Sequence, residues 1–146
     1  MRAVVQRAAW ARVSVAGEVV GSLDGSGFVV LVGVRNGDGE VEARALASKL
    51  WTLRIIDDDE GRMNRSLSDV GGGLLVISQF TLYADASKGR RPSFAAAAPG
   101  ALAEPLVERV VEHLRDLGAE VVTGRFGAEM LVELANDGPV TLIIDT

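Results

Sequence analysis

The sequence contains no cysteine and a single histidine, His113, among its 146 residues. Without cysteine the chain has no disulfide bond, no thiolate nucleophile and no cysteine-ligated zinc site. A single histidine likewise rules out a histidine-rich metal site. We therefore expect no metal site built on cysteine or histidine. Any catalysis should depend on hydroxyls, amides, main-chain groups and the substrate's own atoms.

The sequence also lacks a long apolar run and an excess of positive charge. Its apolar runs are too short to cross a bilayer, and the first residues, Met1 to Arg7, contain no apolar core of secretory length. We expect a cytoplasmic protein with no membrane partner. The net charge of −5 argues against a protein that coats nucleic acid nonspecifically. No DNA partner is therefore expected, but a local basic patch is compatible with this charge.

The residues that are present predict one globular domain spanning residues 1–146. Apolar residues make up 48% and charged residues 24% of the chain, which is enough to bury a core. Strands are predicted for residues 2–10 and 28–34, and a hairpin for residues 13–21 about Gly17. The continuously apolar run at 28–34 is typical of a strand that is buried on both faces.

Two segments change to the period of a helix. Residues 40–54 place their apolar side chains on one side, and residues 102–117 do the same before Gly118 ends the helix. Pro105 is tolerated in the second helix only within its first turn. The remaining predictions are a turn at 57–61, an irregular loop at 84–98, and strands at 74–80, 120–123, 130–135 and 140–144. This order predicts an α/β chain closer to the α+β kind, with mixed or antiparallel sheets and two main helices on one side.

One polar set, Ser78-Gln79-Phe80-Thr81, stands where the strand at 74–80 ends. The end of a strand exposes unpaired main-chain N–H groups, and the neighbouring hydroxyl and amide add donors. Donors aimed at one point stabilise a developing oxyanion; the plainer interpretation is that these residues only end the strand. Thr81 becomes a nucleophile only if a base activates it, and the single histidine belongs to a helix.

A second set, Gly138-Pro139, precedes the strand expected at 140–144. Proline is common at the start of a strand, so one interpretation is a simple strand boundary. The other is a cis peptide bond, which points two main-chain carbonyls the same way and so probes a ligand's shape with main-chain atoms. Composition alone does not decide between them.

Charged residues leave similar alternatives open. Lys88, Arg90 and Arg91 form the densest cationic run, which suits either phosphate contact or a solvated loop. Arg7 lies in the first predicted strand, where it is either exposed or partly buried against an acceptor. His113 falls at the edge of the apolar stripe of its helix, and we expect it to be structural.

Five segments, in order along the whole chain, together resemble the D-aminoacyl-tRNA deacylase family. They are Met1–Arg7, Ser78–Tyr83, Gly89–Phe94, Thr123–Ala128 and Asn136–Thr141. The resemblance implies a layered β-β-α sandwich and an editing hydrolase without a cofactor. Such an enzyme cleaves the ester between a D-amino acid, or the achiral glycine, and the 3′-terminal adenosine of tRNA. It also implies a homodimer with its sites at the interface.

The same resemblance implies a role for each matching position. The catalytic set is Ser78, Gln79, Phe80 and Thr81. In this set the main-chain N–H groups of Phe80 and Thr81 face the scissile carbonyl, and the 2′-hydroxyl of the terminal ribose replaces a general base. Thr81 is accordingly not expected to be a covalent nucleophile.

Chiral selection is implied for a second group of residues. Gly138 and Pro139, joined by a cis bond and held by Arg7, would enter the partner's pocket and leave no room for an L side chain. The other substrate-binding positions are Val140, Thr141 and Met130. The tRNA contacts are expected at Lys88, Arg90 and Arg91.

Three other hypotheses are compatible with the sequence. One is a module that binds RNA ends through the cationic run without cleaving them. Another is a structural dimer that has no small-ligand site. The third is a related deacylase with a trans bond before Pro139 and an altered chiral preference.

Overall fold

The computed structural model describes residues 1–87 and 89–146, and its sheet is organised around one long strand. This strand, β1 (Arg2–Val15), pairs antiparallel with β3 (Gly27–Gly33) along its first half and with β2 (Glu18–Leu23) along its second half. On its other edge it pairs antiparallel with β8 (Leu131–Asp145) over most of its length. Because β1 changes partner midway, the sheet bends and becomes nearly barrel-like.

The remaining strands extend the sheet from β3. Strand β6 (Gly73–Ser78) lies parallel to β3, and β7 (Val121–Thr123) lies parallel to β6. The order along the main path is therefore β2-β1-β3-β6-β7, with β8 beside β1. The sheet is mixed, as the sequence predicts.

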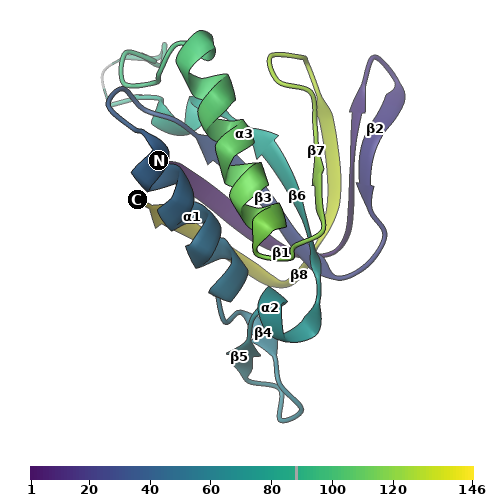
Figure 1. The fold of residues 1–146 in the computed structure, drawn as a ribbon. Helices are drawn as coiled ribbons and strands as arrows, with labels where there is room; N and C mark the ends of the chain where they lie inside the picture. The colour runs from purple at the N-terminus through teal and green to yellow at the C-terminus, as the bar shows by residue number, and fades with distance from the viewer. Residues whose placement is uncertain (88) are drawn as a thin grey trace.

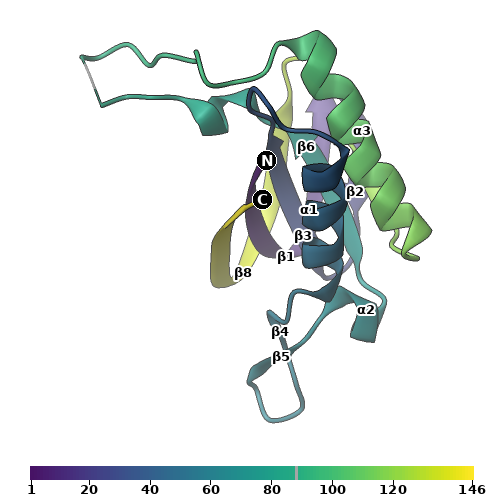
Figure 2. The same ribbon diagram turned by 60° about the vertical axis from the view of Figure 1, so that its left-hand side comes forward.

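Two main helices, α1 (Glu40–Thr52) and α3 (Gly100–Asp116), cover one face of the sheet (Figure 1). A short hairpin of β4 (Ile56–Asp57) and β5 (Met63–Arg65) extends away from the sheet, followed by α2 (Leu67–Val70) (Figure 2). One turn of 3₁₀ helix, η1 (Phe80–Tyr83), follows β6. No helix among the described residues has the length and apolar character needed to cross a membrane.

The core consists of two apolar clusters, one on each face of β3 and β6. Along β6, Leu74 and Val76 belong to the cluster beneath the helices, whereas Leu75 and Ile77 belong to the opposite cluster. This alternation follows from the two-residue period of a strand. The prediction that the apolar run at 28–34 is buried on both faces is thus confirmed.

The helices and most of the strands occur where the sequence predicts them, including the hairpin about Gly17, whose φ is +83°. The predicted number of strands was wrong: residues 130–135 and 140–144 were expected to form two strands, but they belong to the single strand β8. Both halves pair with the same edge of β1, and the residues between them bulge out of the ladder. Pro105 lies in the second turn of α3, since that helix begins at Gly100.

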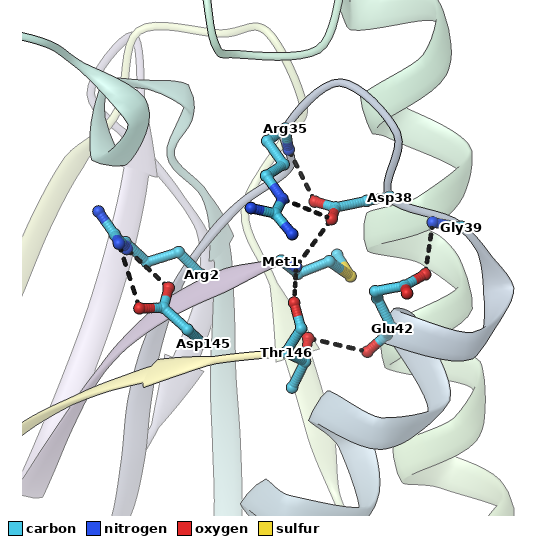
Figure 3. Close-up of polar contacts among 8 residues, drawn as sticks. All are labelled: Met1, Arg2, Arg35, Asp38, Gly39, Glu42, Asp145 and Thr146. Atoms are coloured by element: carbon cyan, nitrogen blue, oxygen red, sulfur yellow. Dashed lines mark hydrogen bonds and ion pairs between the residues drawn. The ribbon is translucent and has the colours of Figure 1, made fainter.

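The two ends of the chain lie side by side (Figure 3). The Met1 ammonium donates to the Thr146 carbonyl at 2.7 Å and lies 3.0 Å from a carboxylate oxygen of Asp38. The Thr146 hydroxyl donates to the Glu42 carbonyl at 3.2 Å. These contacts connect the ends of β1 and β8 to α1 and to the loop before it.

Candidate functional site

The strand end at Ser78 is positioned by its neighbour β3. The Gln79 N–H donates to the Val32 carbonyl at 2.7 Å, and the chain then turns into η1. A Cβ at Gly33 would lie 3.1 Å from the Gln79 carbonyl oxygen and 3.1 Å from Leu82 Cβ. Gly33 therefore allows η1 to pack closely against the end of β3. Residues 79–80, expected in the strand, leave it because η1 begins at Phe80.

Two main-chain donors are free at this turn. The first N–H groups of a helical turn have no partner within it, and in the described part of the chain no hydrogen bond is found from the N–H of Phe80 or Thr81. The Gln79 side-chain amide donates to the Thr81 hydroxyl oxygen, which orients both side chains. Phe80 is 56% exposed. The prediction of a donor-rich strand end agrees with this arrangement.

A cavity of about 480 Å³ opens beside these residues. Ser78, Gln79 and Phe80 line it from the strand end, Val107 from α3, and Phe126 and Met130 from the connection between β7 and β8. None of its lining residues among those described carries an ionisable side chain. The described lining therefore includes the hydroxyl of Ser78 and the amide of Gln79 but no side-chain acid or base, and the free N–H groups of η1 lie next to it in the chain.

A second cavity of about 570 Å³ adjoins the first and shares Ser78, Val107, Phe126 and Met130 with it. Its far side is charged and includes Glu104 on α3. Of the two adjoining cavities, the uncharged one is therefore the one next to the free donors of η1.

The Gly138-Pro139 turn lies elsewhere in the chain. Gln6 of β1 pairs with Thr141, whereas Ala8 pairs with Asn136, so four residues of β8 bulge out opposite Arg7 alone. The peptide bond between Gly138 and Pro139 is cis. Gly138 has φ of +119°, which favours glycine, and a Cβ there would lie 3.2 Å from Arg7 Nη2.

Arg7 is buried against this turn. Its guanidinium Nε donates to the Asp137 carbonyl at 3.2 Å and lies 3.3 Å from an Asp137 carboxylate oxygen. Its Nη1 donates to the Ile55 carbonyl at 2.9 Å and to Asp57 Oδ1 at 3.0 Å. Of the two interpretations of Arg7, the structure thus supports the buried one, with acceptors on both sides of the guanidinium.

The predicted site residues therefore form two groups. The cavity group contains Ser78, Gln79, Phe80 and Met130 as lining residues, with Thr81 next to them. The turn group contains Arg7, Gly138, Pro139, Val140 and Thr141, none of which lines the cavity of its own chain. Val32, which lines the cavity, pairs with Ala3, whereas the turn lies opposite Arg7.

The predicted tRNA-binding residues lie on the loop between η1 and α3. Arg90 and Arg91 are exposed, and Lys88 lies outside the described residues. Phe94 of the same loop packs edge-on against Phe80, with ring centroids 5.1 Å apart. This contact connects the cationic loop to the cavity.

His113 has the structural role that the sequence predicts. Its Nε2 lies 2.6 Å from Glu40 Oε1, and Arg109 contacts the same carboxylate, so the three residues join α1 to α3. The Arg109 guanidinium, together with His113, lowers the pKa of Glu40 from 4.5 to about 2. This network does not contribute to either group of site residues.

Several cavity residues were not predicted as site residues. Val32 and Val34 were expected only as part of a buried strand, Ala98 as part of an irregular loop, and Ala103 as part of a helix. Phe126 also lines the cavity. Its segment, Thr123–Ala128, was matched to the family, so that motif was the available signal.

Free main-chain donors beside an uncharged cavity, on a bent mixed sheet covered by two helices, form the kind of site expected in a hydrolase that stabilises an oxyanion. Residues 4–145 match the sequence model of the family described as D-Tyr-tRNA(Tyr) deacylase, and the chain belongs to that family. The family resemblance of the five sequence segments is thereby confirmed.

Curated relatives are similar over their whole length. A D-aminoacyl-tRNA deacylase of Thermobifida fusca (strain YX) is 59% identical over 145 residues, covering 99% of each chain. One of Nocardia farcinica (strain IFM 10152) is 58% identical over 148 residues, covering 100% of each.

Solved structures agree with this fold. The c-Myc DNA Unwinding Element Binding Protein superposes with a TM-score of 0.93 at 36% identity, covering 100% of this chain and 99% of that one. A probable eukaryotic D-amino acid tRNA deacylase superposes with a TM-score of 0.86 at 18% identity, covering 99% and 98%, and supports the fold alone. The predicted fold class is confirmed.

Proposed function

We propose that this chain, acting as a single deacylase domain over residues 1–146, hydrolyses the ester of D-aminoacyl-tRNA and releases free D-amino acid and tRNA. Glycine mischarged on tRNA is a second substrate, because it has no side chain to exclude. The observation that carries the proposal is the pair of free N–H donors at Phe80 and Thr81 beside an uncharged cavity. Family membership and the names of the curated relatives support the same substrate class.

The chemistry follows from what the cavity offers. Water adds to the ester carbonyl, and the oxyanion that develops accepts hydrogen bonds from the N–H groups of Phe80 and Thr81. The tetrahedral intermediate then expels the 3′-oxygen of the ribose, which takes up the proton that the water has lost. We assign the relay of this proton to the 2′-hydroxyl of the same ribose, because no ionisable side chain lines the described cavity.

Chiral selection, in this proposal, requires two subunits. The Gly138-Pro139 turn does not line the cavity of its own chain, so we infer that it enters the cavity of a partner subunit and excludes an L side chain there. Val140 and Thr141 complete the turn, and Met130 lines the receiving cavity. Leu131 and Ile143 of β8 are 64% and 68% exposed, which supports a homodimer formed through this part of the sheet.

The tRNA end is proposed to reach the cavity across the loop that carries Lys88, Arg90 and Arg91. The exposed guanidinium groups suit phosphate oxygens, and the contact of Phe94 with Phe80 connects this loop to the catalytic donors. We place the activity in the cytoplasm, with tRNA and a second copy of the chain as partners and with no membrane or DNA partner.

A direct assay compares D-tyrosyl-tRNA with L-tyrosyl-tRNA. We expect release of D-tyrosine and an intact L-ester. Equal loss of both esters would contradict chiral exclusion, whereas binding of tRNA without cleavage of either ester would favour the RNA-end-binding hypothesis. The third hypothesis, a related deacylase with an altered chiral preference, predicts a different ratio of the two rates in the same assay.

Subunit mixing tests the composite site. A Thr81→Pro chain lacks one oxyanion donor, and a Pro139→Ala chain has an altered turn. If the turn acts on the partner's cavity, a mixed dimer regains one intact site, and D-selective activity should return when the two inactive or unselective preparations are mixed. No recovery in a confirmed mixed dimer would place the turn and the donors of one site in the same subunit.

A further inference from the structure

Three parts of the chain meet at the Arg7 guanidinium. Strand β1 contributes Arg7 itself, β8 contributes Asp137 at the start of the bulge, and the β4–β5 hairpin contributes Asp57 and the Ile55 carbonyl just before it. The Arg7 side chain is 8% exposed, while those of Asp57 and Asp137 are 47% and 52% exposed. A buried guanidinium is thus held between two half-exposed carboxylates that approach from different elements.

We propose that Asp57 is a positioning residue for the Gly138-Pro139 turn and acts on it through Arg7. The expected effect on substrate choice rests on the proposed function, in which the turn excludes L side chains. Asp57 does not line the cavity. We therefore expect a substitution of Asp57 to change selectivity and to leave the chemistry in the cavity unchanged.

The guanidinium geometry supplies the coupling. Arg7 is planar and its donors have fixed directions, so fixing Nη1 also fixes where Nε and Nη2 point. Nη1 is fixed from one side by the Ile55 carbonyl at 2.9 Å and Asp57 Oδ1 at 3.0 Å. Nε then donates to the Asp137 carbonyl, and Nη2 lies 3.2 Å from the position that an added Cβ would occupy at Gly138.

The hairpin that carries Asp57 is held in place by its own hydrogen bonds. The Asp58 N–H donates to the Arg62 carbonyl at 2.8 Å, and the Asp58 carboxylate accepts from the N–H groups of Glu60 and Arg62 at 2.9 and 3.0 Å. Arg54, just before the hairpin, donates to the Asn64 carbonyl at 2.7 Å. These bonds fix the start of the hairpin on both sides of Asp57.

Asp57 also balances the charge around Arg7. With Asp57 present the guanidinium has one carboxylate on each side, at 3.0 and 3.3 Å. Without it, Asp137 is the one carboxylate left beside Arg7 among the described residues. The guanidinium is then drawn toward the bulge, and the turn is held from one side only.

Kinetics with four variants test the proposal. Asp57→Ala removes the acceptor, Asp57→Asn keeps an oxygen but removes the charge, and Asp57→Glu keeps the carboxylate. Asp59→Asn is the matched control, because Asp59 lies on the same hairpin and pairs with Arg65 at 2.7 Å instead of Arg7. The measured quantity is the ratio of kcat/KM for D-tyrosyl-tRNA to kcat/KM for L-tyrosyl-tRNA.

We expect this ratio to fall about tenfold for Asp57→Ala, the factor that about 1.4 kcal/mol represents. It should fall less for Asp57→Asn, recover in part for Asp57→Glu, and stay unchanged for Asp59→Asn. The fall should come from a gain of activity on the L-ester, with kcat on the D-ester nearly constant. Equal ratios for Asp57→Ala and Asp59→Asn, in an enzyme that does prefer the D-ester, would overturn the proposal.

A measurement that does not depend on activity separates this inference from the proposed function. In ¹H–¹⁵N spectra, Asp57→Asn should shift the amide resonances of Asp137 and Gly138, and Asp59→Asn should leave them in place. If those shifts occur and the wild type shows no preference for the D-ester, the coupling stands and the proposed function fails. If the Gly138 resonance does not move in Asp57→Asn, the coupling itself is wrong.

Discussion

The cavity beside Phe80 contains no ionisable side chain among its described lining residues, whereas the turn at Gly138-Pro139 packs against a buried guanidinium with a carboxylate on each side. The two regions also differ in how the chain builds them. The cavity forms where β6 ends and η1 begins, through main-chain contacts and a close approach at Gly33. The turn is a bulge in β8 that depends on side-chain contacts across three elements.

This difference assigns different tasks to the two regions. Main-chain donors have fixed directions and do not titrate near neutral pH, which suits stabilisation of an oxyanion at a fixed point. A charged side-chain network can hold a loop that has no ladder partners of its own. We therefore expect substitutions at the cavity to change rate and substitutions around Arg7 to change stability and selectivity.

The largest effect is expected from removal of a main-chain donor. Thr81→Pro eliminates the Thr81 N–H at a position in the first turn of η1, where proline is tolerated. Loss of one oxyanion donor costs about a hundredfold to a thousandfold in kcat. The measurement is kcat on D-tyrosyl-tRNA, with circular dichroism used to confirm the fold.

Thr81→Ala is the matched control, because it removes the hydroxyl that accepts from Gln79 and keeps the N–H. Activity should fall less than about tenfold, the scale of one neutral hydrogen bond. Complete loss of activity in a folded Thr81→Ala protein would show that the hydroxyl takes part in the chemistry. In that case the contrast between the two regions would no longer hold.

The next effect concerns the turn. Arg7→Ala removes a buried guanidinium that donates to the carbonyls of Ile55 and Asp137 and to the Asp57 carboxylate. We expect the free energy of unfolding to fall by about 2–4 kcal/mol and L-tyrosyl-tRNA to become a substrate. Urea unfolding and the two-ester assay measure these effects.

Arg12→Ala is the comparison for that variant. Arg12 lies on the same strand and pairs with Glu133 at 2.6 Å, but its side chain is 50% exposed, so its removal should have little effect. If Arg7→Ala and Arg12→Ala lower the free energy of unfolding equally, the burial of Arg7 does not make it more stabilising than Arg12.

The sequence predicts the parts of this molecule that depend on local pattern. The continuously apolar run of β3 indicates burial on both faces of a strand, the apolar stripe of α1 indicates burial on one face of a helix, and the five motif segments indicate the family. The polar set after the apolar run of β6 was also visible in the sequence, although the strand ends at Ser78 and not at Phe80. Predictions of this kind need only neighbouring residues.

What the sequence did not predict depends on contacts between distant segments. β8 is one strand because both of its halves pair with β1, which lies more than a hundred residues earlier. The contact of Asp57 with Arg7 joins residues 50 positions apart, and the segment around Asp57 read only as a solvated turn. Composition left the bond before Pro139 undecided, because proline is common at the start of a strand whichever isomer its bond adopts.

A smaller effect should follow from crowding the end of β3. A Cβ at Gly33 would lie 3.1 Å from the Gln79 carbonyl oxygen, so Gly33→Ala should displace η1 by a few tenths of an ångström. Donors moved from their positions stabilise an oxyanion less well, and we expect kcat to fall about tenfold. Gly25→Ala, where nothing lies within 4 Å of the added carbon, is the control and should keep full activity. Equal activities for the two variants would mean that η1 tolerates the shift.

The smallest effect concerns a third group of charges, which joins α1 to α3; its members Glu40, Arg109 and His113 neither line the cavity beside Phe80 nor contact Arg7. Glu40 on α1 accepts from Arg109 at 2.9 Å and contacts His113 at 2.6 Å, and its side chain is 43% exposed. The Arg109 side chain is 46% exposed, whereas that of Arg7 is 8% exposed, so the guanidinium of this network is the more accessible to solvent and salt. Its contribution should therefore depend on pH and leave catalysis unchanged.

The direction of that dependence follows from the pKa of Glu40, which the Arg109 guanidinium and then His113 lower from 4.5 to about 2. Because the folded state favours the carboxylate, the stabilisation is complete above about pH 4.5 and is lost as the pH falls toward about 2. The difference in unfolding free energy between wild type and Glu40→Gln should shrink over that interval. Urea midpoints of the two proteins, measured at several pH values, test this. A Glu40→Gln difference that does not change with pH would mean that the Glu40 network contributes nothing measurable to the free energy of unfolding.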